Sequence, residues 1–276
     1  MNKTTAVLVA IIVLLVGSFA WYAAKHPDRS SEMRDDTEQG VVGEDSRHVG
    51  PRTLNADIEA AGLDTLGLQV RVGELRVTAS HDDEVHVQLT LRPKERSFLG
   101  FLHWSGGLSH DISAASIHQD RKDKRLTLSL DLDGHDQDEV KQEWDVQVPV
   151  RLKLDSVMNV GEMDIADVAG GVGAKLDVGE LEIDVPQGSI DADVNVGEIR
   201  AKSASSHHGR IQLASNIGDA TLLFQGAESG VHEHGGLGNK VSMDGDGPDS
   251  MDLRLNIGQV TLHLTSADAA HKGAGK

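Results

Sequence analysis

The chain has 276 residues, a formal net charge of −18 at pH 7 and no cysteine. This excess of negative charge argues against a nucleic-acid partner and against adsorption to an anionic membrane surface. Without cysteine the chain has no disulfide, no lipoprotein acylation and no thiolate zinc site. Aromatic residues make up only 3% of the chain, so its core must be built mainly from aliphatic side chains.

The first predicted element is an apolar segment at the N-terminus. Residues 6–24 are nearly all apolar, carry no charge and end close to a Trp-Tyr pair. About 20 apolar residues span a bilayer, and Trp and Tyr favour its interface. We therefore expect residues 1–24 to form an uncleaved transmembrane helix. A cleavable signal peptide is the alternative, because residues 18–20 resemble a small-x-small cleavage site.

The charges around this segment bear on its orientation. Lys25, Arg29 and Arg34 follow it, whereas only Lys3 and the terminal amine precede it. The positive-inside rule would keep such a flank in the cytoplasm, but large domains are translocated largely regardless of charge. We expect a single-pass protein of the cell membrane whose domain is periplasmic or extracellular.

Two polar segments bound the predicted domain. Residues 25–52 are acidic and contain glycine and proline, which is typical of a flexible linker. Residues 266–276 are small and polar and are expected to form a disordered tail. The folded domain is therefore predicted to extend over residues 53–265.

Strand-like alternation begins at Leu66. Apolar residues recur at every second position in residues 66–77, 85–91, 126–132 and 144–154, which predicts β-strands with one buried face. No segment after residue 24 has the pattern of a long helix.

An aromatic cluster lies between the second and third of these runs. It comprises Phe98, Phe101, His103 and Trp104, in a chain with only eight Phe, Trp and Tyr residues. If exposed, such a patch marks a contact with a partner or a membrane. The alternative, which we favour, is a cap that closes the N-terminal end of a repeat fold.

A short phrase is repeated between Asp155 and Leu264. The sequence Asn-Val-Gly-Glu at 159–162 recurs as Asp-Val-Gly-Glu at 177–180 and as Asn-Val-Gly-Glu at 195–198, and looser copies follow at 216–219 and 256–259. Successive glycines are 18, 18, 21 and 40 residues apart. A period near 20 with alternating apolar residues is typical of a solenoid, in which each repeat stacks on the last.

Each repeat is predicted to contain two short strands. Residues 190–196 alternate apolar and polar, Gly197 interrupts, and alternation then resumes with shifted phase, so the glycine marks a corner. We expect an all-β, right-handed-type parallel β-solenoid with rungs of about 18–20 residues, preceded by a transmembrane helix. Glu180 and Glu198 should be exposed, and the continuous core should include Val178, Ile183, Val194, Val196, Ile199, Leu222 and Leu262. A glycine-rich loop at 225–250 is expected to interrupt the repeats.

The acidic residues after equivalent glycines should form a ladder on one edge. This ladder would comprise Glu162, Glu180, Glu198 and Asp219. Carboxylates one strand apart repel each other, and a bound cation would relieve that repulsion. The alternative, which we favour, is a solvated acidic edge that hinders aggregation of an open sheet. The Asn and Asp residues that begin each copy are expected to form a structural ladder or turn bonds.

Histidines offer the only other candidate for metal binding. His207 and His208 are adjacent, and His232 and His234 lie in the glycine-rich loop. No third ligand occurs at a recognisable spacing, so we predict no metal and no cofactor. No catalytic triad, phosphate-binding glycine loop or pair of catalytic carboxylates is evident, and the repeats offer acids without matching bases. The protein is therefore predicted not to be an enzyme.

The strand at 144–154 followed by glycine-acid turns resembles a known family. Trp-Asp-Val-Gln-Val-Pro-Val at 144–150, then Val-Gly-Glu-Met-Asp-Ile at 160–165 and the later Gly-Glu-Leu and Gly-Glu-Ile turns, is similar to the bacterial adhesin-like β-solenoid domains, also called the toastrack fold. The resemblance covers residues 66–264, with Glu where the family pattern has Asp. It implies a membrane-tethered, extracytoplasmic domain with no catalytic motif.

From these observations we predict a non-enzymatic, membrane-tethered β-solenoid. It would act as an adhesin-like or envelope-associated interaction module, with an unidentified protein or envelope partner. One alternative is a self-assembling scaffold that stacks end to end, as bactofilin-like β-helices do. A polysaccharide-active β-helix enzyme is a further alternative, which would need acids and bases clustered on one face.

Overall fold

A computed structural model describes residues 51–93, 112–134, 137, 140–205, 208–225, 227–235 and 237–265. The chain separates into two units, residues 1–47 and 48–276, and all described residues belong to the second. A search of the described residues for a helix long and apolar enough to cross a membrane found none. The predicted anchor, nearly all of the linker, the aromatic cluster at 98–104 and the tail lie outside these residues.

The described part of the chain is all-β, as predicted. Its strands form one 14-stranded sheet, and a 3-10 turn occupies Ile112–Ala114. The strands are β1 (Arg52–Glu59), β2 (Thr65–Ser80), β3 (Glu84–Pro93), β4 (Ser116–Lys122), β5 (Arg125–Asp131), β6 (Val140–Pro149), β7 (Lys153–Ala166), β8 (Val172–Val185), β9 (Ile190–Ser203), β10 (His208–Phe224), β11 (Ala227–Glu228), β12 (Val231–Gly235), β13 (Gly238–Met243) and β14 (Asp249–Leu264).

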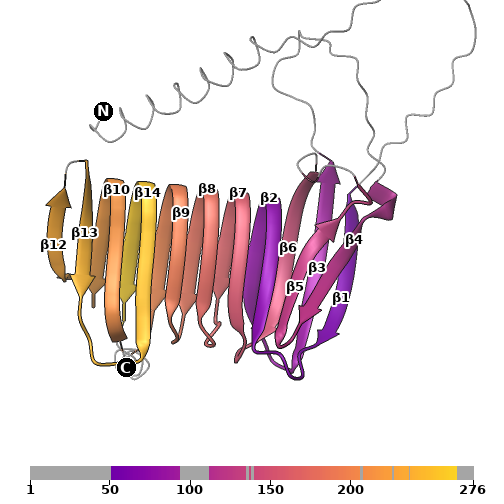
Figure 1. The fold of residues 1–276 in the computed structure, drawn as a ribbon, viewed down its shortest axis with the longest axis horizontal. Coiled ribbons are helices and arrows are strands. Elements are labelled where there is room, and N and C mark those ends of the chain that lie inside the picture. The colour runs from indigo at the N-terminus through magenta and orange to yellow at the C-terminus, as the bar shows by residue number, and fades with distance from the viewer. Residues whose placement is uncertain are drawn as a thin grey trace, which may run out of the picture. The chain divides into compact units, whose positions relative to one another are not determined.

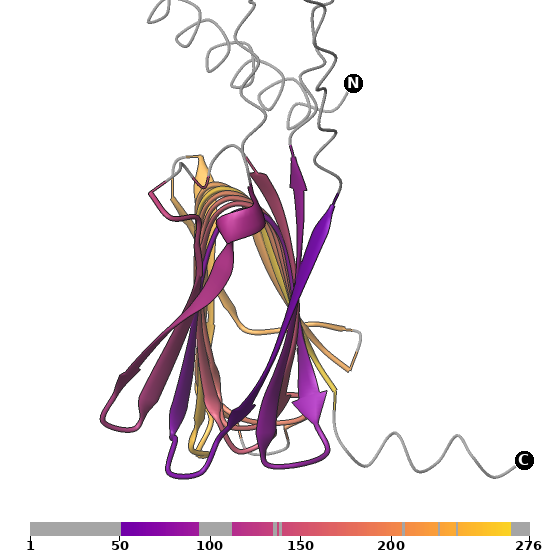
Figure 2. The same ribbon diagram turned by 90° about the vertical axis from the view of Figure 1, so that its right-hand side faces the viewer.

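Six long strands bend sharply in the middle, so that each contributes to two facing arms (Figures 1 and 2). These strands pair in parallel, with glycine opposite glycine, in the order β2, β7, β8, β9, β14 and β10. The glycine of each bend has a φ between +129° and +148°, a conformation that side chains other than glycine rarely adopt. The expectation of a glycine corner in every repeat is confirmed.

The spatial order of the last strands differs from their order in the chain. β14 lies between β9 and β10 and pairs in parallel with both. The 40-residue step between Gly218 and Gly258 therefore does not extend the stack. After β10 the chain forms β11, β12 and β13, and it then returns to form β14 between β9 and β10.

The two ends of the stack are built differently from its middle. At the N-terminal end, β5 pairs with the first half of β2 and β6 with its second half. Two separate strands therefore take the place of one long bent strand there. β3 and β1 then continue one arm as antiparallel strands, and β4 continues the other. At the C-terminal end, the antiparallel hairpin of β12 and β13 pairs with the first half of β10.

Two sequence-based expectations about strands were wrong. Residues 225–250 contain β11, β12 and β13 instead of one loop. The predicted strand at 144–154 is broken by a turn after Pro149, where the N–H of Leu152 donates to the Pro149 carbonyl at 2.9 Å. The many glycines in residues 225–250 favoured the prediction of a loop, although short antiparallel strands form there. The apolar alternation on both sides of Pro149 favoured one continuous strand, although a turn interrupts it.

One continuous core fills the space between the two arms. One inward row of the first arm consists of Leu66, Leu154, Val172, Ile190, Met251 and Ile211, all buried. A matching row of the second arm consists of Val77, Ile165, Ile183, Ala201, Leu262 and Leu222, also buried. Of the seven predicted core residues, Ile183, Val194, Ile199, Leu222 and Leu262 are buried as expected.

The other two predicted core residues lie on the outside of the bend. Val178 is 44% exposed, and Val196 is half-buried. The reason is that inward positions 194 and 199 are five residues apart, and the chain between them turns around the edge of the core. Strict alternation placed these valines inside, whereas the bend turns them outward. Glu180 is exposed as predicted, and Glu198 is only half-exposed.

One buried hydroxyl group offers a test of this packing. Ser156 is 2% exposed, and its hydroxyl has no hydrogen-bond partner among the described residues. At the paired positions of the next two strands, β8 has Ala174 and β9 has Ala192. Because an unsatisfied buried hydroxyl costs about 1–3 kcal/mol, Ser156→Ala is expected to raise the free energy of unfolding by about 1 kcal/mol. Urea unfolding followed by circular dichroism measures the change.

Ser215 is the matched control. It is 4% exposed, but its hydroxyl donates to the Gly258 carbonyl at 3.2 Å. Ser215→Ala should therefore lower the free energy of unfolding by about 1 kcal/mol. If the two substitutions changed stability in the same direction, the assignment of Ser156 as the unsatisfied group would be wrong.

Candidate interaction surface along the bend

A row of partly exposed aliphatic side chains follows the outside of the bend. We call it the aliphatic ridge; in spatial order it comprises Val72, Val160, Val178, Val196, Ile257 and Ile217. Each member is the direct Cα partner of the next. Val160 and Val178 are both 44% exposed, and the others are half-buried. Since neighbouring strands lie about 4.8 Å apart, the ridge is about 24 Å long.

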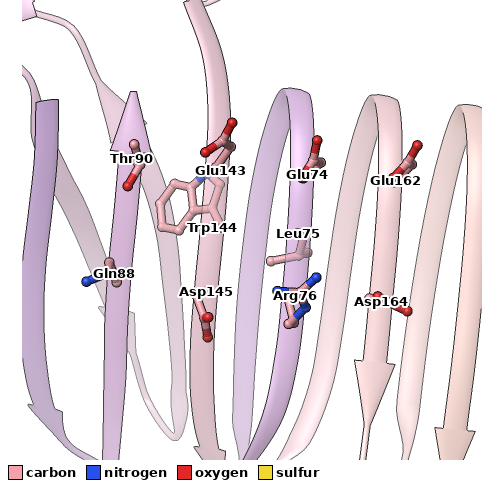
Figure 3. A pocket seen from close by; sticks show the side chains of 10 residues that line it. All are labelled: Glu74, Leu75, Arg76, Gln88, Thr90, Glu143, Trp144, Asp145, Glu162 and Asp164. Carbon is pink, nitrogen blue, oxygen red and sulfur yellow. The ribbon is translucent and has the colours of Figure 1, made fainter. Parts of the chain in front are cut away.

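An acidic row runs beside the ridge, two residues further along each of these strands and onto β6. In spatial order it comprises Glu143, Glu74, Glu162, Glu180, Glu198, Gln259 and Asp219. Figure 3 shows its first three carboxylates side by side. The structure thus places the predicted Glu162, Glu180 and Glu198 next to one another and inserts Gln259 before Asp219.

Cations lie beside much of this row. Lys141 Nζ lies 2.5 Å from Glu74 Oε1 and 3.8 Å from Glu143 Oε1. Arg200 contacts the carboxylates of Glu198 at 2.7 Å and Glu180 at 3.5 Å. The hydrogen bond to Glu74 raises the pKa of Lys141, and the one to Glu198 raises the pKa of Arg200.

These contacts correct the expectation that the repeats lack matching bases. In addition to Arg200, Lys202 pairs with Glu182 at 3.1 Å, on the same arm. Arg200 follows Glu198 by two residues, so both side chains lie on the same face of one strand. Lys202 and Glu182 lie on neighbouring strands and are brought together by strand pairing. Among the described residues, no ion pair involves Glu162 or Asp219.

A shallow open groove of about 210 Å³ lies where the acidic row meets the N-terminal strands. Its lining is mostly charged: Glu74, Leu75, Arg76, Gln88, Thr90, Glu143, Trp144, Asp145, Glu162 and Asp164. Figure 3 shows Glu143, Glu74 and Glu162 in one line and, below them, Asp145 and Asp164 on either side of Arg76. Nevertheless, no three Asp, Glu or His side chains within the described residues are placed to hold a metal ion.

An amide ladder borders the other side of the ridge. Asn216 Nδ2 donates to Asn256 Oδ1 at 3.0 Å, and Asn256 Nδ2 donates to Asn195 Oδ1 at 3.1 Å. The structural ladder expected from the Asn and Asp positions is confirmed for these three residues. The ladder runs in the order Asn195, Asn256, Asn216, which differs from the order in the chain, because β14 lies between β9 and β10.

The candidate histidine and aromatic sites can be placed only in part. His232 and His234 lie on β12 with stacked rings 6.5 Å apart, and His232 Nε2 is 3.7 Å from Glu228. His208 begins β10, and His207 lies outside the described residues. Phe98, Phe101, His103 and Trp104 also lie outside them. For these aromatic residues, neither the cap nor the partner contact is tested, and both stay predictions.

A histidine that the sequence did not single out links two strands. His86 Nδ1 lies 2.7 Å from Asp57 of β1, and its Nε2 lies 3.0 Å from Asp82 of the β2–β3 turn. The hydrogen bond to Asp57 raises the pKa of His86, and the bond from Ser80 lowers the pKa of Asp82 to about 2. Because only protonated imidazole has two N–H donors, the charged form of His86 fastens the edge strand to the turn.

Glu74 and Glu143 extend the acidic row beyond the predicted ladder, and Glu143 has no motif to mark it. Glu143 belongs to β6, which has no Val-Gly-Glu phrase, and Gln142 occupies the position of the bend glycine. No local signal in this strand marks the register. Only the pairing of β6 with the second half of β2 shows that Glu143 continues the row.

Comparisons with known proteins show distant structural likeness. No protein-family model and no curated protein matches the chain. It is similar to a "putative cell adhesion protein" from Clostridium sporogenes, with 14% identity, a TM-score of 0.48, and coverage of 78% of this chain and 99% of that one. A "putative adhesin" from Bacteroides fragilis has 12% identity, a TM-score of 0.27, and coverage of 77% and 97%. A "putative lipid binding protein" from Parabacteroides distasonis has 10% identity, a TM-score of 0.25, and coverage of 80% and 98%. At these values the likeness carries no argument about function.

Proposed function

We propose that the protein is a non-enzymatic β-solenoid, tethered to the cell membrane, that acts outside the cytoplasm as an adhesin-like or envelope-associated interaction module. The observation that carries this proposal is the aliphatic ridge, which is partly exposed along six strands and bordered by the acidic row. Contiguous apolar surface with a polar rim marks an interaction site.

The sequence supports the proposed tether. Residues 6–24 are long and apolar enough to span a bilayer. The linker predicted over residues 25–52, whose last residue begins β1, would as a random coil have an average reach of roughly 30 Å. Such a linker would let the domain turn its ridge toward partners near the membrane.

Stacking end to end, as in the scaffold alternative, is disfavoured by the C-terminal end. The hairpin of β12 and β13 covers the first half of β10 with antiparallel strands. Beside the second half, the Asn239 side chain accepts from the N–H of Ala220 and donates to its carbonyl. These contacts use backbone groups that another parallel strand would need.

The enzyme alternative has less support than an interaction module. The charged groove holds about 210 Å³, which is less than the 300–1,000 Å³ of typical ligand sites. It is also open to solvent, whereas catalytic acid–base chemistry gains from the exclusion of water. Glu143, one of its carboxylates, is held by Arg92 at 2.7 Å.

The proposal can be tested by cysteine footprinting, because the chain has no cysteine of its own. Two single variants are used, Val178→Cys on the ridge and Asp246→Cys in the exposed loop before β14. In spheroplasts of producing bacteria, a membrane-impermeant maleimide should label both. Labelling at 178 should be about fivefold slower than in the purified full-length protein, because a bound partner shields it, and labelling at 246 should be unchanged.

Two results would contradict the proposal. Labelling of Asp246→Cys only after lysis would place the domain in the cytoplasm. Equal rates at position 178 in spheroplasts and in purified protein would remove the evidence for a partner on the ridge.

A further inference from the structure

We propose that the ridge and the acidic row together bind a cationic amphipathic α-helix of a partner protein. This inference rests on the proposed function and names the chemistry of its partner. It is carried by three properties of the surface: the spacing of the ridge, its length and the charge on its flanks.

The spacing of the ridge fits a helix better than a strand. Ridge side chains repeat at the strand separation of about 4.8 Å. Along an α-helix one face repeats every 5.4 Å, whereas along a strand residues of one face repeat about every 6.6–6.8 Å. A single row of projecting side chains can lie in the groove between two side-chain rows of a helix.

The length of the ridge sets the length of the helix. Five strand separations amount to about 24 Å, which corresponds to about 16 residues at a rise of 1.5 Å. Over this length a straight helix makes about 4.5 turns against the five steps of the ridge. The mismatch is therefore about half a step, and most ridge positions would contact the helix.

The charge on the flanks selects a basic partner. Beside the six ridge positions, the acidic row places a carboxylate in five and Gln259 in the sixth. Lys141 and Arg200 satisfy part of this row, whereas Glu162 and Asp219 have no ion pair among the described residues. Within the described part of the chain, these two carboxylates are available to Lys or Arg from a helix that lies on the ridge.

A second copy of the chain is the less suitable occupant. The net charge of −18 repels another copy at every distance within the Debye length, about 8 Å at physiological salt. A cationic helix gains from the same field, and its association should weaken as salt screens the attraction. The occupant that fits the ridge is therefore a basic helix supplied by another protein.

The test measures binding of a synthetic 18-residue Leu/Lys peptide designed as an amphipathic helix. Full-length protein in nanodiscs of zwitterionic lipid is titrated against the fluorescent peptide, and empty nanodiscs are subtracted. We expect saturable binding at 50 mM salt and at least tenfold weaker binding at 200 mM. A Leu/Glu peptide of the same length should not bind.

Two substitutions in β7 separate apolar contact from charge. Val160 lies on the ridge and is 44% exposed, and Val157 lies off the ridge and is 45% exposed. Val160→Asp should weaken binding about tenfold although it adds negative charge, because it removes an apolar contact. Val157→Asp should leave binding unchanged or slightly tighter. If Val160→Asp does not fold, the similarly shaped Val160→Thr replaces it, with about threefold weaker binding expected.

Several outcomes would overturn the inference. These are tighter or unchanged binding with Val160→Asp, equal loss with Val157→Asp, equal binding of the Leu/Glu peptide, or no binding by the wild type. A dimer in light scattering that disappears with Val160→Asp would instead assign the ridge to a second copy. Since all these measurements use purified protein, they are independent of the footprint that tests location and partner binding in the cell.

Discussion

Replacing Gly179 by alanine is expected to lower the free energy of unfolding by more than about 4 kcal/mol, or to abolish folding. A Cβ atom at this position would lie 1.8 Å from the carbonyl oxygen of Gly161 on the neighbouring strand. That oxygen belongs to the paired backbone, so it cannot move without breaking the ladder. The φ of +147° adds backbone strain to the clash.

The expected loss is large compared with the total stability of a domain. Natural domains are stable by about 5–15 kcal/mol, and about 4 kcal/mol would lower the melting temperature by roughly 10 °C or more in a chain of this size. Thermal unfolding followed by circular dichroism measures the change. Gly161→Ala and Gly197→Ala should behave alike, since each Cβ would lie 1.7–1.8 Å from the glycine oxygen of the adjacent strand.

Substitutions at two other glycines distinguish the effect of the Cβ clash from the effect of backbone strain. Gly62 has a φ of +74° but no atom within 4 Å of an added Cβ, so Gly62→Ala should cost only about 1–2 kcal/mol. Gly235 has open space and no positive φ, so Gly235→Ala should be nearly neutral. If Gly179→Ala were no worse than Gly62→Ala, close approach of the bends would not be what excludes a side chain there.

A disulfide between Asp193→Cys and Arg254→Cys is expected to form almost completely on mild oxidation. These residues are direct Cα partners on β9 and β14, and partner strands are close enough for a disulfide. Closing a loop of about 60 residues should raise the free energy of unfolding by about 4 kcal/mol. Non-reducing gels, peptide mass analysis and urea unfolding measure these effects.

The matched control is the pair Asp193→Cys and Ala214→Cys. Ala214 lies on β10 opposite Arg254, so β14 separates it from Asp193. Two strand separations amount to about 9.6 Å, which exceeds the reach of a disulfide. Only traces of this second cross-link should form. A reversed result would place β10 directly beside β9, in the order of the chain.

Sequence alone was enough to predict the glycine bends in the middle of the fold. The Asn-Val-Gly-Glu phrases mark the bends because glycine is required there both by the positive φ and by the 1.7–1.9 Å approach of an added Cβ to the next carbonyl. Inward positions such as Ile183 and Val194 followed from alternation, since a strand has a period of two. Both requirements are local, so they leave a local trace in the sequence.

The acidic ladder shows how far a local trace extends. Glu162, Glu180 and Glu198 are neighbours in space because consecutive repeats of 18 residues stack directly. Glu143 joins the same row without any repeat, because β6 pairs with β2 over a long separation in sequence. Lys141 was missed for the same reason, because it meets Glu74 across strands 67 residues apart. Arg200, in contrast, follows Glu198 by only two residues and could have been found from the sequence.

The sequence by itself determined the all-β class, the glycine bends and most of the aliphatic core. Tertiary structure alone decided that β14 inserts between β9 and β10 and that Val160 and Val178 face outward on the ridge. The insertion of β14 cannot be read from its sequence, because its Asn-Ile-Gly phrase pairs in register with the phrases of both β9 and β10. The ridge depends on the sharpness of the bend, which turns a residue outward although its place in the alternation predicts burial.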